Sequence, residues 1–474
     1  MGTWQVLPYL APILPINAAL LHTGKVVFVA GSGNDPTNIG TPNGSVVWDP
    51  NAGTFVQPLT PTDASGQPFD LFCCGQSFQA QGQLMIAGGT LAYDPFKGLP
   101  IALTIDPTTL QWTTRASMNF GRWYPTVLTL GSGRNFAVSG LDASGSLCVQ
   151  PEVYASTFGW KAFPPTASRF PMFAHLFLMS DGRVFYSGGN MGGNGGVTPR
   201  IMSLPGNFSK PITETPVAGL ASPDSADQAA SVLMPPAQDQ RVMIMGGGMA
   251  MTGTNGVGTN RVAIASLASQ TPTYATAPSL NYGRMHVSAV VLPDRTVFVC
   301  NGAALGEDAT TAPLPSEIYD PAANTWSVDA TPTVPRVYHS VAFLLPDGRV
   351  VTAGGNPNRG VDELRIEIYS PWYMTQTRPV IQSAPTSIGY GGTLTIRTPQ
   401  AANIKWVNLV RPGAPTHSMD TDQRLVDAPI TARTSTSLTT SVTNNRNLAP
   451  PGWYMLFITD TTGVPSTATW LQLS

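Results

Sequence analysis

A thiol, a phenol and two imidazoles occupy equivalent places in a repeated sequence pattern. The sequence contains seven repeats, each with a turn glycine or its substitute. The residues nine places before that turn are Pro15, Cys73, Tyr124, Phe173, Ser231, His286 and His339. Tyr338 stands next to His339. In a ring of repeats, equivalent positions surround a common axis. We therefore expect these side chains to meet near that axis.

These side-chain types support a narrow range of chemistry. Imidazole and phenolate ligands favour Cu(II) in a tetragonal field, whereas zinc and magnesium sites hold more thiolate or carboxylate. The sequence contains no nucleophile–base triad of known spacing, no phosphate loop and no dinucleotide motif. Each residue alone is more often structural, because cysteine and tyrosine commonly pack in cores and a single histidine is seldom a ligand. Their shared position is what favours copper.

The repeat predicts the fold. A turn, four or five apolar residues and a Gly-Gly pair or its remnant recur at 24–31, 82–89, 133–140, 182–189, 240–247, 295–302 and 348–355. The spacing of about fifty residues is typical of kelch-type blades. An apolar strand precedes the turn, and a further strand, an Asp-Pro-type turn and an aromatic residue follow, as in 317–326. Four short antiparallel strands per repeat predict an all-β, seven-bladed kelch-type β-propeller.

The two ends of the chain complete this prediction. Trp4 matches the outer-strand aromatic residues of the repeats, and the last repeat stops near Trp372 after its third strand. We expect residues 3–7 to supply the missing outer strand of the seventh blade, which leaves no open sheet edge. The strands after this point alternate without Gly-Gly pairs, as in an immunoglobulin-like β-sandwich of roughly seven strands. The predicted domains are the propeller, 1–377, and the sandwich, 378–474.

Charge and composition limit the partners. Charged residues make up 11% of the chain, the net charge is −2, and no Lys/Arg run occurs, so we expect no nucleic-acid partner. Residues 8–21 are apolar but too short and too interrupted by proline to span a bilayer. No leader-like segment follows Met1, so the chain is either cytoplasmic or a mature form with an added start methionine. The low-charge β composition favours a secreted or cell-surface protein, and we expect a monomer.

Four sequence motifs surround the candidate residues. They are Phe72-Cys73, Arg-Trp-Tyr-Pro at 122–125, Arg-Val-Tyr-His-Ser at 336–340 with Leu-Pro-Asp-Gly-Arg at 345–349, and Thr-His-Ser-Met-Asp-Thr-Asp-Gln-Arg at 416–424. In kind and order they resemble the motifs of the copper radical oxidases, the family that includes galactose oxidase and the glyoxal oxidases. The resemblance covers both predicted domains and implies one copper ion held between them.

The resemblance also implies a role for each residue. Cys73 Sγ is expected to form a thioether with the ring of Tyr124, which ligates copper and carries a radical. His339 and His417 are the expected imidazole ligands, so a loop of the second domain must enter the propeller. Tyr338 is the expected axial ligand and takes the proton from a bound alcohol. The implied reaction converts a primary alcohol or aldehyde and O2 to an aldehyde or acid and H2O2.

Two details of the implied cofactor stay open. Cys74 competes with Cys73 for the cross-link, although Cys73 follows a phenylalanine and keeps the ring position. Residues 141–142 are Leu-Asp, where galactose oxidase has the indole that stacks on its cofactor. We therefore expect any stacked ring to come from elsewhere, with Trp123 and Phe173 as candidates.

The substrate and two competing functions also stay open. The segment 221–228 lacks the arginine with which galactose oxidase holds its sugar, so a small alcohol or aldehyde, as for the glyoxal oxidases, is favoured over galactose. His175 and His286 have no ligand role in the family and are either neighbours of the ligands or core histidines. The competing functions are a non-catalytic kelch propeller that binds a glycan or protein partner, and a copper protein that acts on a cell-surface polysaccharide.

Overall fold

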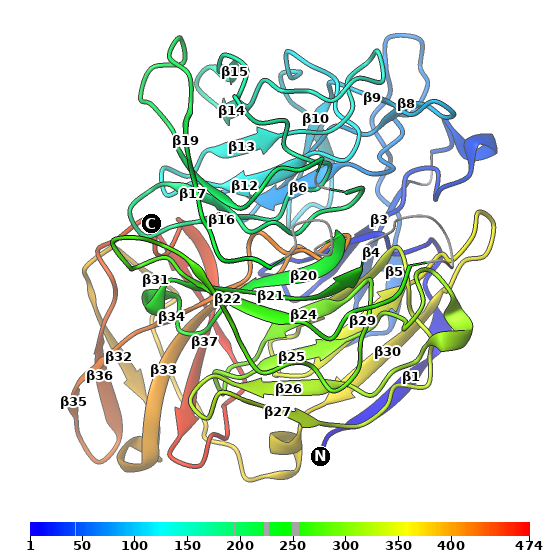
Figure 1. Cartoon of the computed structure of the whole chain (residues 1–474). Coiled ribbons are helices and arrows are strands. Elements are labelled where there is room, and N and C mark those ends of the chain that lie inside the picture. The colour runs from blue at the N-terminus through cyan, green and yellow to red at the C-terminus, as the bar shows by residue number, and fades with distance from the viewer. Residues whose placement is uncertain (43, 194, 222–226, 249–255) are drawn as a thin grey trace.

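Strands form most of the regular structure, as the turn-rich composition with 47 glycines and 44 prolines favours. The structure is a computed structural model that describes residues 1–474 except 43, 194, 222–226 and 249–255. Seven four-stranded antiparallel sheets follow one another along residues 3–370, and two further sheets form the C-terminal part (Figure 1). The predicted all-β fold class is confirmed.

Within each of the seven sheets the strands pair in sequence order, except that β1 joins the last sheet. The first three are β2 (Asn17–Leu20), β3 (Val26–Val29), β4 (Ser45–Asp49) and β5 (Thr54–Val56); β6 (Gly75–Phe78), β7 (Leu84–Ala87), β10 (Ala102–Ile105) and β11 (Trp112–Thr114); and β12 (Thr126–Thr129), β13 (Asn135–Val138), β14 (Glu152–Ala155) and β15 (Gly159–Ala162). The next two are β16 (Leu176–Leu178), β17 (Val184–Tyr186), β18 (Arg200–Ser203) and β19 (Thr213–Pro216); and β20 (Asp227–Leu233), β21 (Arg241–Gly248), β22 (Val262–Ser266) and β23 (Tyr274–Thr276). The last two are β24 (Ser288–Val291), β25 (Val297–Cys300), β26 (Glu317–Asp320) and β27 (Thr325–Val328); and β28 (Ser340–Leu344), β29 (Val350–Gly354), β30 (Arg365–Ser370) and β1 (Thr3–Leu10).

Short elements decorate these sheets. β8 (Thr90–Ala92) and β9 (Lys97–Gly98) form a separate hairpin. The described 3-10 helices are η1 (Pro36–Asn38), η3 (Ala237–Asp239), η5 (Ala309–Thr311), η6 (Trp372–Thr375) and η7 (Ala401–Asn403).

The N-terminal strand completes the last sheet. β1 pairs antiparallel with β30, with Thr3 opposite Ser370 and Trp4 opposite Tyr369. In Figure 1 the blue N-terminal strand accordingly lies beside the yellow β30. The prediction that residues 3–7 supply the missing outer strand is confirmed, and the pairing covers an edge that would otherwise be open.

The first strand of each sheet, which we call its innermost strand, contacts the innermost strand of a neighbouring sheet in five cases. β6 lies against β12, β12 against β16, β20 against β24, β24 against β28, and β28 against β2. Seven blades around one axis remain our interpretation of these seven sheets. The Gly-Gly pairs permit the close approach of neighbours: the Gly89 amide donates to the Arg122 carbonyl at 3.0 Å, and a Cβ on Gly88 would lie 2.3 Å from that oxygen.

The C-terminal part is a two-sheet sandwich of eight strands. One sheet contains β31 (Ser387–Ile388), β38 (Thr469–Leu473), β37 (Gly452–Asp460), β33 (Ile404–Arg411) and β34 (Arg424–Asp427), and the other β32 (Thr393–Arg397), β36 (Ser437–Ser441) and β35 (Ile430–Arg433). Its buried core continues into the fourth and fifth repeat sheets, so the two parts share packed apolar side chains. The sandwich prediction is confirmed, and we propose its boundary at 377/378, after β30 has ended and before β31 begins.

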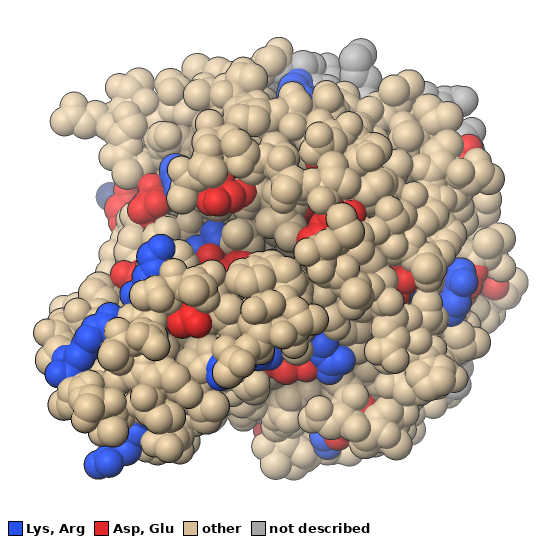
Figure 2. All heavy atoms as spheres, turned by 90° about the horizontal axis from the view of Figure 1, so that it is seen from below, with Lys and Arg blue, Asp and Glu red and all other residues tan. Residues whose placement is uncertain are grey.

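The chain carries few charged side chains, and the described helices are short. On the face shown in Figure 2, basic and acidic side chains are sparse and lie among one another. Among the described residues, no helix is both long and apolar enough to cross a bilayer.

Candidate copper site

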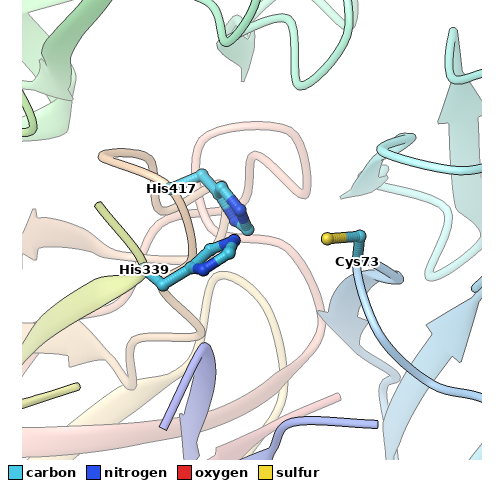
Figure 3. Close-up of side chains that lie close together, drawn as sticks. All are labelled: Cys73, His339 and His417. Carbon is cyan, nitrogen blue, oxygen red and sulfur yellow. The ribbon is translucent and has the colours of Figure 1, made fainter. Parts of the chain in front are cut away.

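Three buried side chains from distant parts of the chain approach one another, and Figure 3 shows both imidazoles turned toward the thiol. Cys73 Sγ and one ring nitrogen each of His339 and His417 all lie within 4.8 Å of one another. The Tyr124 hydroxyl lies 3.3 Å from Nε2 of His339 and 3.2 Å from Nε2 of His417. The Tyr338 hydroxyl shares a hydrogen bond with it. The structure thus brings all five predicted residues together.

The ring residues share a backbone conformation that non-glycine residues rarely adopt. Cys73, Tyr124 and His339 have φ angles of 60°, 64° and 63°, a left-handed region that costs about 1–2 kcal/mol per residue. Main-chain hydrogen bonds hold them there, because the Tyr124 amide donates to the Cys73 carbonyl and the Phe173 amide to the Tyr124 carbonyl, both at 3.0 Å. Conformational strain of this kind concentrates at functional sites.

One ring position differs from the sequence analysis. The pattern assigns Ser231 to the ring, but Gln228 takes this place: its φ is 57° and its carbonyl accepts from the His286 amide at 3.0 Å. The count fails because η3 lengthens the hairpin between β20 and β21. Ser231 lies farther along β20, where its hydroxyl is 3.1 Å from Nδ1 of His175.

Buried arginines hold the segments that precede the ring residues. Arg122 donates to two main-chain carbonyls and pairs with Glu152 at 2.8 Å, with both side chains fully buried. Arg284 forms the same arrangement with Glu317 at 3.0 Å. Arg336 donates to two carbonyls and to the Thr352 hydroxyl. These three arginines therefore anchor the segments that present Tyr124, His286 and His339.

A loop of the sandwich, residues 412–423, carries His417 between the repeat sheets. Thr421 donates to a carbonyl of β12 at 2.8 Å, and Asp422 accepts from an amide of β6 at 3.1 Å. Gln423 bonds to two main-chain groups of β24, at 2.8 and 3.0 Å. The Thr-Asp-Gln sequence thus fastens the loop to three different innermost strands. This explains how a residue outside the repeats reaches the site.

The hydrogen bonds of Thr416 determine which nitrogen of His417 is free. Its hydroxyl lies 3.1 Å from the Ile16 carbonyl, to which it donates, and 2.6 Å from Nδ1 of His417. The hydroxyl has one proton and two acceptor oxygens beside it, the Ile16 carbonyl and Asn17 Oδ1 at 3.2 Å, so we assign it as the acceptor of Nδ1–H of the imidazole. Nε2 then carries a lone pair and faces the Tyr124 hydroxyl. This is the tautomer that a metal ligand requires.

Burial keeps the whole set neutral. It raises the pKa of the Tyr124 and Tyr338 hydroxyls and of the Cys73 thiol well above their usual values. It also lowers the pKa of His339 to about 3 and that of His417 well below its usual value. A site of neutral imidazoles and phenols without a carboxylate is suited to one cation, whose charge favours phenolate formation.

The structure distinguishes the two adjacent cysteines. Cys73 packs in one apolar cluster with Tyr124, whereas Cys74 belongs to a different cluster. The Cys74 sulfur lies 3.9 Å from the side-chain amide of Asn17. All four cysteines are free in this structure. The geometry therefore favours Cys73 as the partner of Tyr124.

Aromatic rings cover the phenol on two sides. The Trp123 ring is parallel to the Tyr124 ring, with centroids 3.8 Å apart and an interplanar angle of 6°. Phe173 lies 4.6 Å from Tyr124 at 30° and 4.4 Å from the ring of His417. Trp123 is the stacked ring, and Phe173 contacts both the phenol and the imidazole, which also contact each other.

The remaining histidines have different surroundings. His175 is fully buried, and its Nδ1 lies 3.1 Å from the Ser231 hydroxyl, whereas its Nε2 has no hydrogen-bond partner in the described part of the chain. His286 lies 5.5 Å from the Tyr338 ring, and its buried Nε2 has no hydrogen-bond partner in the described part of the chain. The segment 221–228, singled out for its missing arginine, lies largely outside the described residues.

Two regions of the chain match known protein families. Residues 378–473 match the galactose oxidase-like early set domain, and residues 219–373 match the glyoxal oxidase N-terminus. Galactose oxidase of Gibberella zeae is 29% identical over 98% of this chain and 69% of that protein. Aldehyde oxidase GLOX of Vitis pseudoreticulata is 25% identical over 100% of this chain and 97% of that protein.

A solved structure matches over the full length. A fungal alcohol oxidase of the AA5 family, in complex with copper, superposes with a TM-score of 0.83 at 25% identity, covering 100% of this chain and 99% of that chain. The matched domains, the oxidase relatives and the copper-containing neighbour together identify a copper-dependent oxidase, and the buried imidazole–phenol–thiol cluster is consistent with one. The chain belongs to the copper radical oxidase family, which includes galactose oxidase and glyoxal oxidase.

Proposed function

We propose that this protein oxidises small primary alcohols or aldehydes with O2, giving aldehydes or acids and H2O2, with a preference closer to that of glyoxal oxidases than of galactose oxidase. The observation that carries the proposal is the position of the Tyr124 hydroxyl. It lies within hydrogen-bond distance of two imidazole nitrogens and of a second phenol.

The donor set fits Cu(II). We assign the metal to Tyr124, Tyr338, His339 and His417, whose free nitrogen and oxygen atoms converge without a carboxylate. When bound, copper together with an oxidised Tyr124 supplies a two-electron acceptor for the substrate. The buried surroundings exclude water from the phenol, which protects a radical there from side reactions.

The protein's own residues have separate tasks in this proposal. Cys73 and Tyr124 are joined when the thiol hydrogen and one ring hydrogen leave, with O2 as the two-electron acceptor, and an S–C bond forms. Tyr338 takes the hydroxyl proton of the substrate. His286 offers the second polar atom, Nε2, near Tyr338 for orienting the substrate.

The surroundings of the phenol support a small substrate with few hydroxyl groups. The cluster around Tyr124 is apolar, and besides the residues already described it includes Leu14, Ile16, Met191 and Met419. Apolar side chains cannot hydrogen-bond the many hydroxyls of a hexose, and burying those hydroxyls without partners is costly. A two- or three-carbon alcohol, or the hydrate of a small aldehyde, presents less polar surface.

We propose that the protein acts outside the cell or at its surface as a monomer. The scarcity of charge and the oxidase relatives support this location. A cell-surface polysaccharide is the alternative substrate, reached through terminal primary hydroxyls. Peroxide release from an insoluble polymer but not from soluble alcohols would favour it.

The decisive experiment combines peptide mass mapping with a peroxide assay. The apoprotein is loaded aerobically with Cu(II), reduced, denatured and digested. Loss of two hydrogens across the peptides of Cys73 and Tyr124, together with peroxide release from methylglyoxal or glycerol above that from galactose, is expected. Recovery of two separate unmodified peptides would overturn the radical oxidase proposal, and Cys74→Ser is the matched control that should cross-link normally.

A further inference from the structure

A continuous series of aromatic rings connects Tyr124 with the protein surface. Trp123 lies 3.8 Å from Tyr124, Phe96 lies 4.1 Å from Trp123 at 12°, and Tyr93 lies 5.1 Å from Phe96, all between ring centroids. We call these four residues the ring stack. Tyr124 and Trp123 are buried, whereas Phe96 and Tyr93 are half-buried on the β8–β9 hairpin. The ring stack thus leads from the proposed radical position to solvent.

The outer end of the ring stack has a built-in proton acceptor. The Tyr93 hydroxyl lies 2.6 Å from the Ser32 hydroxyl, which donates to the Asp70 carboxylate at 2.7 Å. Because Ser32 uses its own proton toward Asp70, it accepts from Tyr93. A phenol that loses an electron becomes a strong acid, so this relay lets Tyr93 lose an electron and a proton together. Ser32 and Asp70 are 3% and 5% exposed, which shields the relay from water.

Trp123 and Phe96, the two middle members of the ring stack, lack such an acceptor. The Trp123 Nε1 is buried without a hydrogen-bond partner in the described part of the chain. Phe96 has no ionisable hydrogen at all. An electron vacancy therefore passes through these two rings but does not rest on them. Tyr93 is the place outside the site where it can rest.

We propose that Tyr93 is a second redox-active tyrosine, through which one-electron oxidants in solution exchange electrons with Tyr124. This inference rests on the proposed function, because it requires Tyr124 to carry a radical. The inference assigns a role to Trp123, Phe96 and Tyr93, which bind neither metal nor substrate in the proposed function. Arg359, which pairs with Asp94 and lies 5.4 Å from the Tyr93 ring, marks the exposed entrance.

With hexacyanoferrate(III) as the oxidant, electrons and protons balance in two steps. The oxidant takes one electron from Tyr93 and becomes hexacyanoferrate(II), while the Tyr93 proton moves to Ser32 and the Ser32 proton to Asp70. Oxidised Tyr93 then takes one electron from the Tyr124 phenolate through the ring stack, and both protons return. The net change is one electron moved from Tyr124 to the oxidant, which leaves Tyr124 as the radical.

The test compares radical formation in copper-loaded, cross-linked wild type and Tyr93→Phe. Each protein is first brought to the Cu(II) form without the radical and then mixed with hexacyanoferrate(III) without substrate, and the phenoxyl absorption is followed in a stopped-flow instrument. We expect Tyr93→Phe to form the radical about tenfold more slowly, which corresponds to a barrier higher by about 1.4 kcal/mol. Turnover of the preactivated protein should match wild type. Tyr282→Phe is the control and should behave as wild type, because Tyr282 is a 36% exposed tyrosine outside the ring stack.

A second readout does not depend on rate. A nitroso spin trap present during oxidation should label Tyr93 in wild type, as mapped by peptide mass, and the label should be lost in Tyr93→Phe. Ser32→Ala keeps the Tyr93 ring and breaks the relay, so it carries the same rate comparison if Tyr93→Phe loses copper or melts early. Equal rates in wild type and both variants would overturn the relay alone. Absence of both cross-link and radical in wild type would overturn the proposed function and the relay with it.

Discussion

Arg122, two residues before the phenol of the candidate site, forms an ion pair of 2.8 Å with Glu152, and neither side chain has exposed surface. Glu152 Oε1 also accepts from the amide and side chain of Asn119, both at 2.7 Å, so each carboxylate oxygen accepts a hydrogen bond. The pair lies between the segment that presents Tyr124 and the strand β14. Stability and site geometry therefore depend on the same contact.

Replacement of this arginine should be strongly destabilising. Arg122→Met removes one partner and leaves the Glu152 carboxylate buried and uncompensated, which costs about 3–5 kcal/mol. The matched control is Asp181→Asn, which breaks the Arg183 pair on the surface, where the side chains are 40% and 46% exposed, and should cost under about 1 kcal/mol. Urea unfolding measures both. Equal losses in the two variants would show that the buried pair has no special weight.

The hydroxyl of Thr416 should control copper affinity without touching the metal. Thr416→Val keeps the shape of the side chain but removes the acceptor for Nδ1–H of His417, so Nε2 is less often the free nitrogen. We expect copper to bind about 10- to 100-fold more weakly. Competition with a chelator of known affinity measures this, and Thr416→Ser should restore binding. An affinity equal in all three proteins would contradict the tautomer assignment.

Loss of the Tyr338 hydroxyl should separate metal binding from turnover. Tyr338→Phe keeps the ring that lies 3.7 Å from His339 and removes only the oxygen beside Tyr124. The copper content should stay close to stoichiometric, because three ligands remain. Peroxide release should fall by about 10²- to 10⁴-fold, the usual contribution of a proton-transferring group. Unchanged turnover would remove Tyr338 from the role of base.

The repeat fold and most of the site follow from patterns within the sequence. The Gly-Gly remnants locate every repeat because a Cβ at positions such as Gly88 would collide with the neighbouring sheet. The same count places Cys73, Tyr124 and His339 at one backbone position, where all three adopt left-handed φ angles. His417 lies outside the repeats, and its place in the site came from the family resemblance alone.

Features that depend on three-dimensional packing could not be predicted in the same way. Gln228 was missed because η3 adds length to a hairpin, and no alternation or glycine marks the insertion. The sequence does not decide between Trp123 and Phe173 as the stacked ring, because Trp123 precedes Tyr124 in the chain and Phe173 holds the equivalent position in the next repeat. Only side-chain packing distinguishes the two. In the sandwich, β34 and β35 are four residues long each and follow the loop 412–423. Their alternation of apolar and polar residues is therefore too short to predict these strands from the sequence.

The isolated nitrogen of His286 should matter to substrate binding. Its Nε2 is buried without a partner in the described part of the chain, and a buried polar atom without a partner is normally avoided unless a ligand or water fills the place. His286→Leu should leave copper affinity unchanged and raise KM for small aldehydes more than it lowers kcat. His286→Gln, which retains a polar tip, should recover part of the affinity for substrate. A variant with wild-type KM would indicate a purely structural histidine.

Asp227 should make the stability depend on pH. Burial at the start of β20 raises its pKa from 3.8 to about 6, although its Oδ1 accepts from the Gly192 amide at 3.0 Å. Below pH 3.8 the carboxyl is protonated in both states and has no effect. Between pH 3.8 and 6 the unfolded chain loses this proton first, so the free energy of unfolding falls as pH rises, and above pH 6 the penalty is complete.

Asp227→Asn keeps an acceptor for Gly192 and removes the charge, so it should equal wild type near pH 3 and exceed its stability by on the order of 2–3 kcal/mol at pH 7. Urea unfolding across this range measures the difference, and a gap that does not change with pH would show that Asp227 titrates normally in the folded protein.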